Sequence, residues 1–119
     1  MQHLFVYGTL IPGQKNDFVL KKLSGTWQKA TVKGFFDKNG WHKTQGFPAV
    51  ILDEYGNTID GYLFSSEELS KNWKMIDDFE SDMYLRVMTT VFLENNHQVI
   101  AYIYELNSSL SHDIQPKKR

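Results

Sequence analysis

Short apolar runs, separated by polar turns, recur along the chain and predict a domain built mainly from strands. Residues 4–7 form an apolar, β-prone run that predicts a buried strand. β-Branched and aromatic side chains recur through residues 26–36, and another apolar run follows at residues 47–52. Residues 58–64 are expected to pair back against that run, because a polar turn directly precedes them.

The second half of the chain predicts a β-hairpin. Residues 94–97 suit a tight turn because asparagine tolerates the left-handed region of backbone space. Residues 99–104 supply the second strand of the hairpin. The first strand, residues 84–93, alternates and places on one face Leu85, Val87, Val91 and Leu93.

Two helices are expected between the strands. Asn16 can cap a short helix over residues 17–23. Ser65 and Glu68 fit a capping box at the start of a second helix, which can run to about residue 80.

The order of these elements predicts an α+β fold. Short turns favour antiparallel pairing, so we expect a small barrel-like, mainly antiparallel sheet with about two flanking helices. We expect one domain over residues 1–106 and a polar C-terminal tail over residues 107–119, where the periodicity is lost.

One carboxylate of the second predicted helix lies on its apolar side. At about 100° per residue, Glu80 lies roughly 20° from Leu69 around the helix axis, and Trp73 and Ile76 lie within roughly 40° of Leu69. A carboxylate that points toward the interior is disfavoured unless it is paired, hydrogen-bonded or protonated, and burial raises its pKa. Such a group can carry a proton near neutral pH.

Two structural alternatives remain open for Glu80 at this point. The helix can end before Glu80, so that the side chain reaches water, or Glu80 can form a buried ion pair with Arg86. Tyr84 and Arg86 share one strand face and can orient Glu80 or a ligand, or serve only the structure. Asp77 and Asp78 are expected to be solvated or capping residues.

The loop after the first strand is the second candidate feature. After Tyr7, the residues Gly8, Thr9 and Leu10 can present successive backbone N–H groups that no strand uses. Such donors suit a carboxylate or a developing oxyanion. An ordinary turn explains the same residues equally simply.

Composition narrows the classes of function. The net charge is −1, from 13 basic and 14 acidic residues, which gives no electrostatic reason to bind nucleic acid or an anionic membrane. The chain has no cysteine, so it has neither a thiolate nucleophile nor a disulfide. We expect a cytoplasmic protein, because no signal peptide and no apolar run of membrane-spanning length is evident.

Metal and cofactor sites are not expected. No metal-ligand spacing is formed by the four histidines, His3, His42, His97 and His112. A nucleic-acid-binding barrel with exposed aromatic residues remains a weaker alternative, because such grooves are usually basic.

Taken together, these segments resemble the gamma-glutamylcyclotransferase-like family, which includes gamma-glutamylamine cyclotransferases. The resemblance extends over residues 4–104. It rests on Val6 to Leu10 with Gly13, Phe47-Pro48-Ala49-Val50, Asp60-Gly61-Tyr62-Leu63, and Asp77 to Glu80 followed by Tyr84 and Arg86.

The resemblance implies a barrel-like fold, Glu80 as the general acid and base, and a substrate-binding loop of Tyr7, Gly8, Thr9 and Leu10. It implies that a gamma-glutamyl amide or amine cyclises to 5-oxoproline and a free amine, with no cofactor. Ser81 departs from the family, in which glycine often follows the catalytic glutamate. A catalytically idle, small-molecule-binding member of the same fold is the alternative function.

Overall fold

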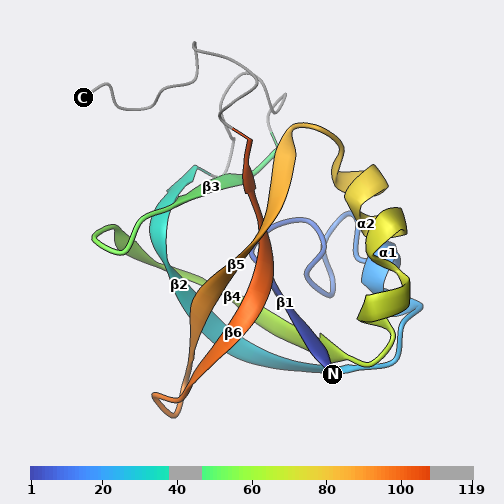
Figure 1. The fold of residues 1–119 in the computed structure, drawn as a ribbon, viewed down its shortest axis with the longest axis horizontal. Coiled ribbons are helices and arrows are strands. Elements are labelled where there is room, and N and C mark those ends of the chain that lie inside the picture. Colours follow the sequence, from blue (N-terminus) through green and yellow to red (C-terminus); the bar gives the residue numbers. More distant parts are fainter. Residues whose placement is uncertain (38–46, 108–119) are drawn as a thin grey trace.

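A computed structural model describes residues 1–37 and 47–107. Six strands form one sheet in the order β3-β2-β4-β1-β6-β5, and an additional pairing between β2 and β5 closes five of them into a barrel (Figure 1). The strands are β1 (Gln2–Val6), β2 (Thr26–Asp37), β3 (Ala49–Leu52), β4 (Asn57–Ser66), β5 (Tyr84–Leu93) and β6 (Gln98–Leu106). All the pairs are antiparallel except β1 with β6, so the predicted fold class is confirmed.

In residues 1–37 and 47–107, three short helical segments accompany the strands. They are α1 (Phe18–Lys21), the 3₁₀ helix η2 (Leu69–Lys71) and α2 (Trp73–Glu80). The helices α1 and α2 lie side by side against one side of the barrel (Figure 1). No helix in the two described ranges is long and apolar enough to cross a bilayer.

The apolar run of β1 is buried on both of its faces. Phe5 belongs to a cluster inside the barrel with Val32, Leu63 and Ile103. Leu4 and Val6 point the other way and pack with the helices in a second cluster. This arrangement explains why β1 shows a continuous apolar run rather than an alternation.

The hairpin of β5 and β6 forms as predicted. Asn96 has a φ of 70°, and the turn is closed by backbone bonds between Leu93 and His97 and from Asn96 to Leu93. Val87, Val91 and Leu93 face the barrel interior. Leu85, near the start of the strand, lies outside this cluster and is exposed.

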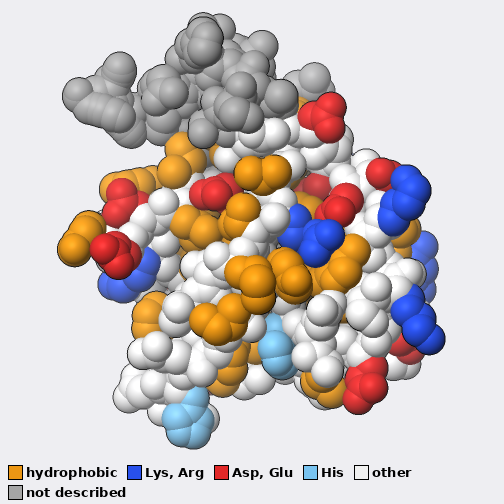
Figure 2. All heavy atoms as spheres, viewed as in Figure 1, with side chains coloured by type: hydrophobic (Ala, Val, Ile, Leu, Met, Phe, Trp, Pro, Cys, Tyr) orange, Lys and Arg blue, Asp and Glu red, His pale blue; other side chains and the backbone are white. Residues whose placement is uncertain are grey.

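The opposite face of this hairpin is also partly apolar. Figure 2 shows apolar side chains gathered over β5 and β6, where Met88 and Ile100 are more than half exposed.

The sequence pattern predicted that residues 58–64 pair with the run that forms β3. In the structure, β4 does not pair with β3. β2 lies between the two strands and pairs with both, so that Gly34 is opposite Leu52 on one side and Asn57 on the other. The connection passes close over β2, because a Cβ atom on Gly56 would lie 2.5 Å from the carbonyl oxygen of Gly34. Two glycines in contact therefore let the chain cross to the other edge of β2.

The predicted long helix begins later than the capping pattern indicated. Ser65 and Ser66 continue β4 and are buried, with Ser65 hydrogen-bonded to His3 and the Ser66 hydroxyl donating to the Ser24 carbonyl. The N–H of Glu68 donates to Ser66 Oγ, not to Ser65. Pairing with β1 therefore prevails over the local capping pattern.

Candidate functional site

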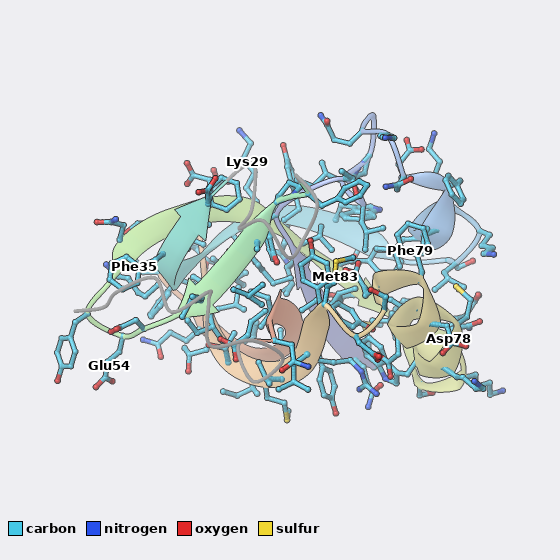
Figure 3. All side chains as sticks on the ribbon, turned by 90° about the horizontal axis from the view of Figure 1, so that it is seen from above. Lys29, Phe35, Glu54, Asp78, Phe79 and Met83 are labelled. Carbon is cyan, nitrogen blue, oxygen red and sulfur yellow. The ribbon has the colours of Figure 1, made fainter. Side chains whose placement is uncertain are left out.

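A pocket of about 120 Å³ opens where the loop after β1 meets the end of α2. Its lining comes from the first loop, the residues before β3, the C-terminal end of α2, the start of β5 and the end of β6. Figure 3 shows Phe79 on α2 and Met83 beside it in the connection to β5. The lining residues are Phe5, Val6, Tyr7, Gly8, Thr9, Leu10, Asn16, Phe47, Pro48, Phe79, Glu80, Met83, Tyr84 and Tyr104.

All four residues of the predicted loop line this pocket. Asn16 holds the loop twice, because its backbone N–H donates to the Thr9 carbonyl and its Nδ2 donates to Thr9 Oγ1, both at 2.9 Å. Asn16 therefore fixes the loop rather than capping α1, whose N-cap is Asp17. Gly8 packs against Pro48, where an added Cβ would lie 3.3 Å from the proline ring.

The loop leaves three successive backbone donors free. Within the described part of the chain, the N–H groups of Gly8, Thr9 and Leu10 donate to no protein acceptor. Unused donors that line a pocket form a concave site suited to a carboxylate or an oxyanion.

Glu80 is the last residue of α2, and it lines the same pocket as the loop. Burial, and secondly the negative charge of Asp77, raise the pKa of Glu80 from its ordinary value of 4.5 to about 7. Both structural alternatives are excluded, because the helix extends through Glu80 and Arg86 pairs with Asp77 instead. Among residues 1–37 and 47–107, the side chain of Glu80 has no ion-pair or hydrogen-bond partner.

Ser81 ends the helix in a conformation that favours glycine. Its φ is 69° and its ψ is −175°, a region that residues with a Cβ rarely adopt. Its N–H still donates to the Asp77 carbonyl at 2.9 Å, and its carbonyl accepts from the N–H of Tyr84. The serine thus takes the sharp turn that directs the chain from Glu80 into β5.

Asp77 has a pairing role that the sequence did not indicate, although its side chain is still 41% exposed. Arg86 donates to both of its carboxylate oxygens, from Nε at 2.9 Å and from a terminal nitrogen at 3.1 Å. The Tyr104 hydroxyl donates to the same carboxylate at 2.6 Å. These bonds hold the pKa of Asp77 below its usual value, with the Arg86 hydrogen bonds as the largest cause.

Tyrosines form the remaining polar wall. Tyr7 donates from its hydroxyl to the carbonyl of Tyr104, and Tyr84 donates to the carbonyl of Pro48, both at 2.6 Å. Burial raises the pKa of each of these phenols, so they remain neutral at physiological pH. Sequence reasoning missed Tyr104, because only the pairing of Tyr104 with Arg86 across β5 and β6 reveals its position.

The two histidines in the described ranges, His3 and His97, do not line the pocket. His3 pairs with Ser65, His97 lies in the exposed hairpin turn, and residues 42 and 112 are outside the described ranges. Among the residues described, no three His, Cys, Asp or Glu side chains gather as metal ligands would.

Comparison with known proteins relates this architecture to one family. The sequence profile described as "Gamma-glutamyl cyclotransferase, AIG2-like" matches residues 4–119. No curated protein matches the chain closely enough in sequence to be aligned with it.

Solved structures share the fold. An AIG2-like protein from Mus musculus is similar with a TM-score of 0.70 and 25% identity, over 91% of this chain and 78% of the mouse chain. YkqA from Bacillus subtilis is similar with a TM-score of 0.68 and 26% identity, over 89% of this chain. The match spans only 36% of YkqA. A gamma-glutamyl cyclotransferase shares the fold at 15% identity, with a TM-score of 0.63, over 89% of this chain and 66% of its own.

Proposed function

The chain belongs to the gamma-glutamyl cyclotransferase, AIG2-like family, and from that premise we propose that it converts a gamma-glutamyl amine to 5-oxoproline and a free amine. The observation that carries the proposal is the juxtaposition of Glu80 with three free N–H donors in one pocket. A proton carrier and an anion cradle are the two parts that this cyclisation requires.

The reaction begins with the substrate's own α-amine as nucleophile. Glu80 in its carboxylate form takes a proton from the α-ammonium group, and the freed amine attacks the side-chain carbonyl carbon. Because nucleophile and electrophile belong to one molecule, the pocket mainly has to hold the substrate in a folded conformation.

Charge then develops on the carbonyl oxygen and is dispersed as the amide bond breaks. The N–H groups of Gly8, Thr9 and Leu10 stabilise either this oxyanion or the substrate's α-carboxylate. Glu80 returns the proton to the departing nitrogen as the carbon–nitrogen bond breaks. The attacking nitrogen gives up its second proton through the regenerated carboxylate to the released amine, which leaves as an ammonium ion. The new lactam bond replaces the amide bond, so neither water nor a protein nucleophile is consumed.

The pKa of Glu80 suits both halves of this proton transfer. A carboxyl group with a pKa of about 7 is partly ionised at neutral pH, so it can accept a proton and give it back. An exposed glutamate would hold the returned proton too weakly to be an effective acid at the same pH.

The lining also indicates the kind of amine that departs. Of the described residues around the pocket, Glu80 alone carries a formal charge. Phe47, Phe79 and Met83 form an apolar wall, and Phe79 contacts the ring of Phe18 edge-on at 6.2 Å between ring centroids. We therefore infer that the leaving amine carries an apolar or aromatic substituent.

The direct test is release of 5-oxoproline from a panel of gamma-glutamyl amines by the parent protein and by Glu80→Gln. We expect Glu80→Gln to lower kcat by at least about a hundredfold, because a positioned general acid and base contributes that much or more. Asp78→Asn is the matched control, since Asp78 lies on the same helix (Figure 3), is exposed and pairs with Lys74.

Parent-like turnover by Glu80→Gln would overturn the role of Glu80. A parent protein that binds 5-oxoproline in this pocket, yet releases none from any member of the panel, would instead identify the idle binding member of the fold.

A further inference from the structure

We propose that Asp77, Arg86 and Tyr104 form a positioning assembly that holds Glu80 against the first loop and sets its proton affinity. The inference rests on the proposed function, since it concerns the proton carrier of that reaction. None of the three residues is placed on the reacting atoms; they act through Glu80.

The pair of Asp77 and Arg86 fixes α2 to the barrel. Two parallel hydrogen bonds join the guanidinium of Arg86 on β5 to the carboxylate of Asp77 on α2. A bidentate pair of this kind restricts orientation as well as distance. Asp77 precedes Glu80 by three residues, so both carboxylates lie on neighbouring positions of one helix face.

Aromatic rings hold the guanidinium in place. Its central carbon lies 4.3 Å from the ring centroid of Trp73 and 5.0 Å from that of Tyr102. Trp73 is itself anchored, because its Nε1 donates to Gln2 Oε1 at 2.6 Å. Arg86 therefore cannot turn toward Glu80 without losing these contacts.

Tyr104 connects the assembly to the loop. Its hydroxyl donates to Asp77 on α2, while its backbone carbonyl accepts from the Tyr7 hydroxyl at the start of the loop. One residue of β6 thus contacts both halves of the pocket. A displacement of α2 relative to the loop would break one of two bonds of 2.6 Å.

The assembly also places a negative charge on the helix that carries Glu80 and a positive charge on the strand beside it. The charge of Asp77 on α2 raises the pKa of Glu80, and the charge of Glu80 in turn raises the pKa of the phenols of Tyr7, Tyr84 and Tyr104. The phenols are neutral at physiological pH, so Asp77 supplies the nearby charge. Arg86 neutralises part of that charge through its two hydrogen bonds to Asp77. Removal of Asp77 should therefore make Glu80 more acidic, and removal of Arg86 should make it less acidic.

This difference in sign gives a test that a merely structural role would fail. The carboxyl carbon of Glu80 is followed by NMR in full-length protein labelled with ¹³C-glutamate, with Glu80→Gln used to assign the signal. We expect Asp77→Asn to lower the midpoint of its titration by about one pH unit, as a unit charge a helical turn away would. Arg86→Met should raise the midpoint.

Matched controls come from the same helix. Lys74 and Asp78 form an exposed i, i+4 pair on the outward side of α2, so Lys74→Met and Asp78→Asn make the same changes of charge away from the pocket. We expect each to move the midpoint by much less than its counterpart, because solvent screens exposed charges. Backbone amide spectra of every variant verify that it is folded.

Tyr104→Phe tests the positioning role with the smallest change. It removes one hydroxyl and no formal charge, and we expect kcat for the cyclisation to fall more than tenfold with little change in KM. Midpoints that move in the same direction in Asp77→Asn and Arg86→Met, or no further than in the controls, would overturn the proposal, as would a Tyr104→Phe variant with the parent's kcat.

The titrations require no turnover, so they separate this inference from the proposed function. Opposite shifts in a protein whose Glu80→Gln variant keeps full activity would support the assembly and refute the role of Glu80 in the reaction. Loss of activity in Glu80→Gln without opposite shifts would refute the assembly and support the role of Glu80 in the reaction.

Discussion

The pocket's proton chemistry depends on the surroundings of one carboxyl group. Glu80 is on a buried helix face, while its neighbour Asp78 is largely exposed on the other. The sequence was sufficient to predict this contrast, because the positions of Leu69, Ile76 and Glu80 share one stripe. The role of Asp77 could not be predicted, since its partners on β5 and β6 are distant in the sequence.

The raised pKa of Glu80 has a consequence for stability that is independent of activity. Below about pH 4.5 the carboxyl group is protonated in both the folded and the unfolded state. Between pH 4.5 and about 7 the unfolded chain loses this proton while the folded protein keeps it, so the free energy of unfolding falls as pH rises. Above about pH 7 the carboxyl group is ionised in both states, and the full cost of burying its charge lowers the free energy of unfolding.

Glu80→Gln should remove this penalty. The gain in free energy of unfolding relative to the parent is expected to increase by up to about 3 kcal/mol from pH 4 to pH 8, at about 1.4 kcal/mol per pH unit of pKa difference. Urea denaturation at the two pH values measures the change. Asp77, whose pKa is lowered, loses its contribution at acid pH in both proteins, so that effect cancels.

The control for this comparison is Asp78→Asn, which removes an exposed carboxylate. Its free energy of unfolding should differ from that of the parent by nearly the same amount at both pH values. A gain for Glu80→Gln that does not depend on pH would mean that Glu80 is ionised normally in the folded protein.

At the scale of elements, α2 supplies both the proposed proton carrier, Glu80, and part of the apolar wall. The C-terminal end of α2 agrees with the sequence pattern, but the helix starts later than the pattern predicts, because Ser65 and Ser66 satisfy their polar groups in the sheet. The first loop was predicted from Gly8 and its neighbours. The attachment of that loop by Asn16 could not be predicted, since an asparagine at this position also suits a helix cap.

If the proposed reaction takes place in this pocket, the apolar wall predicts a preference among amines. Phe79→Ala should lower kcat/KM for gamma-glutamyl phenethylamine roughly two- to tenfold relative to gamma-glutamyl methylamine, because the aromatic contact is lost. Phe35→Ala is the control, as Phe35 is 43% exposed against 40% for Phe79 and lies at the opposite end of the molecule (Figure 3). An unchanged ratio of the two substrates in Phe79→Ala would place the leaving amine elsewhere.

At the scale of the whole molecule, barrel closure brings the separate parts of the site together. β1 lies between β4 and β6, so the loop that follows it emerges beside Tyr104. The strands could be predicted from alternation and turn residues. Their order could not, because the crossing of Gly56 over Gly34 and the parallel pairing of β1 with β6 depend on contacts between distant segments.

The most direct test of Glu80 as the proton carrier is the pH dependence of kcat/KM for a gamma-glutamyl amine. This quantity reports the ionisation of groups in the free enzyme. With Glu80 as the base, kcat/KM should rise about tenfold per pH unit in acid and level off above a midpoint of about 7. A profile that is flat from pH 5 to 8, or that reaches its plateau near the ordinary glutamate pKa of 4.5, would contradict this role.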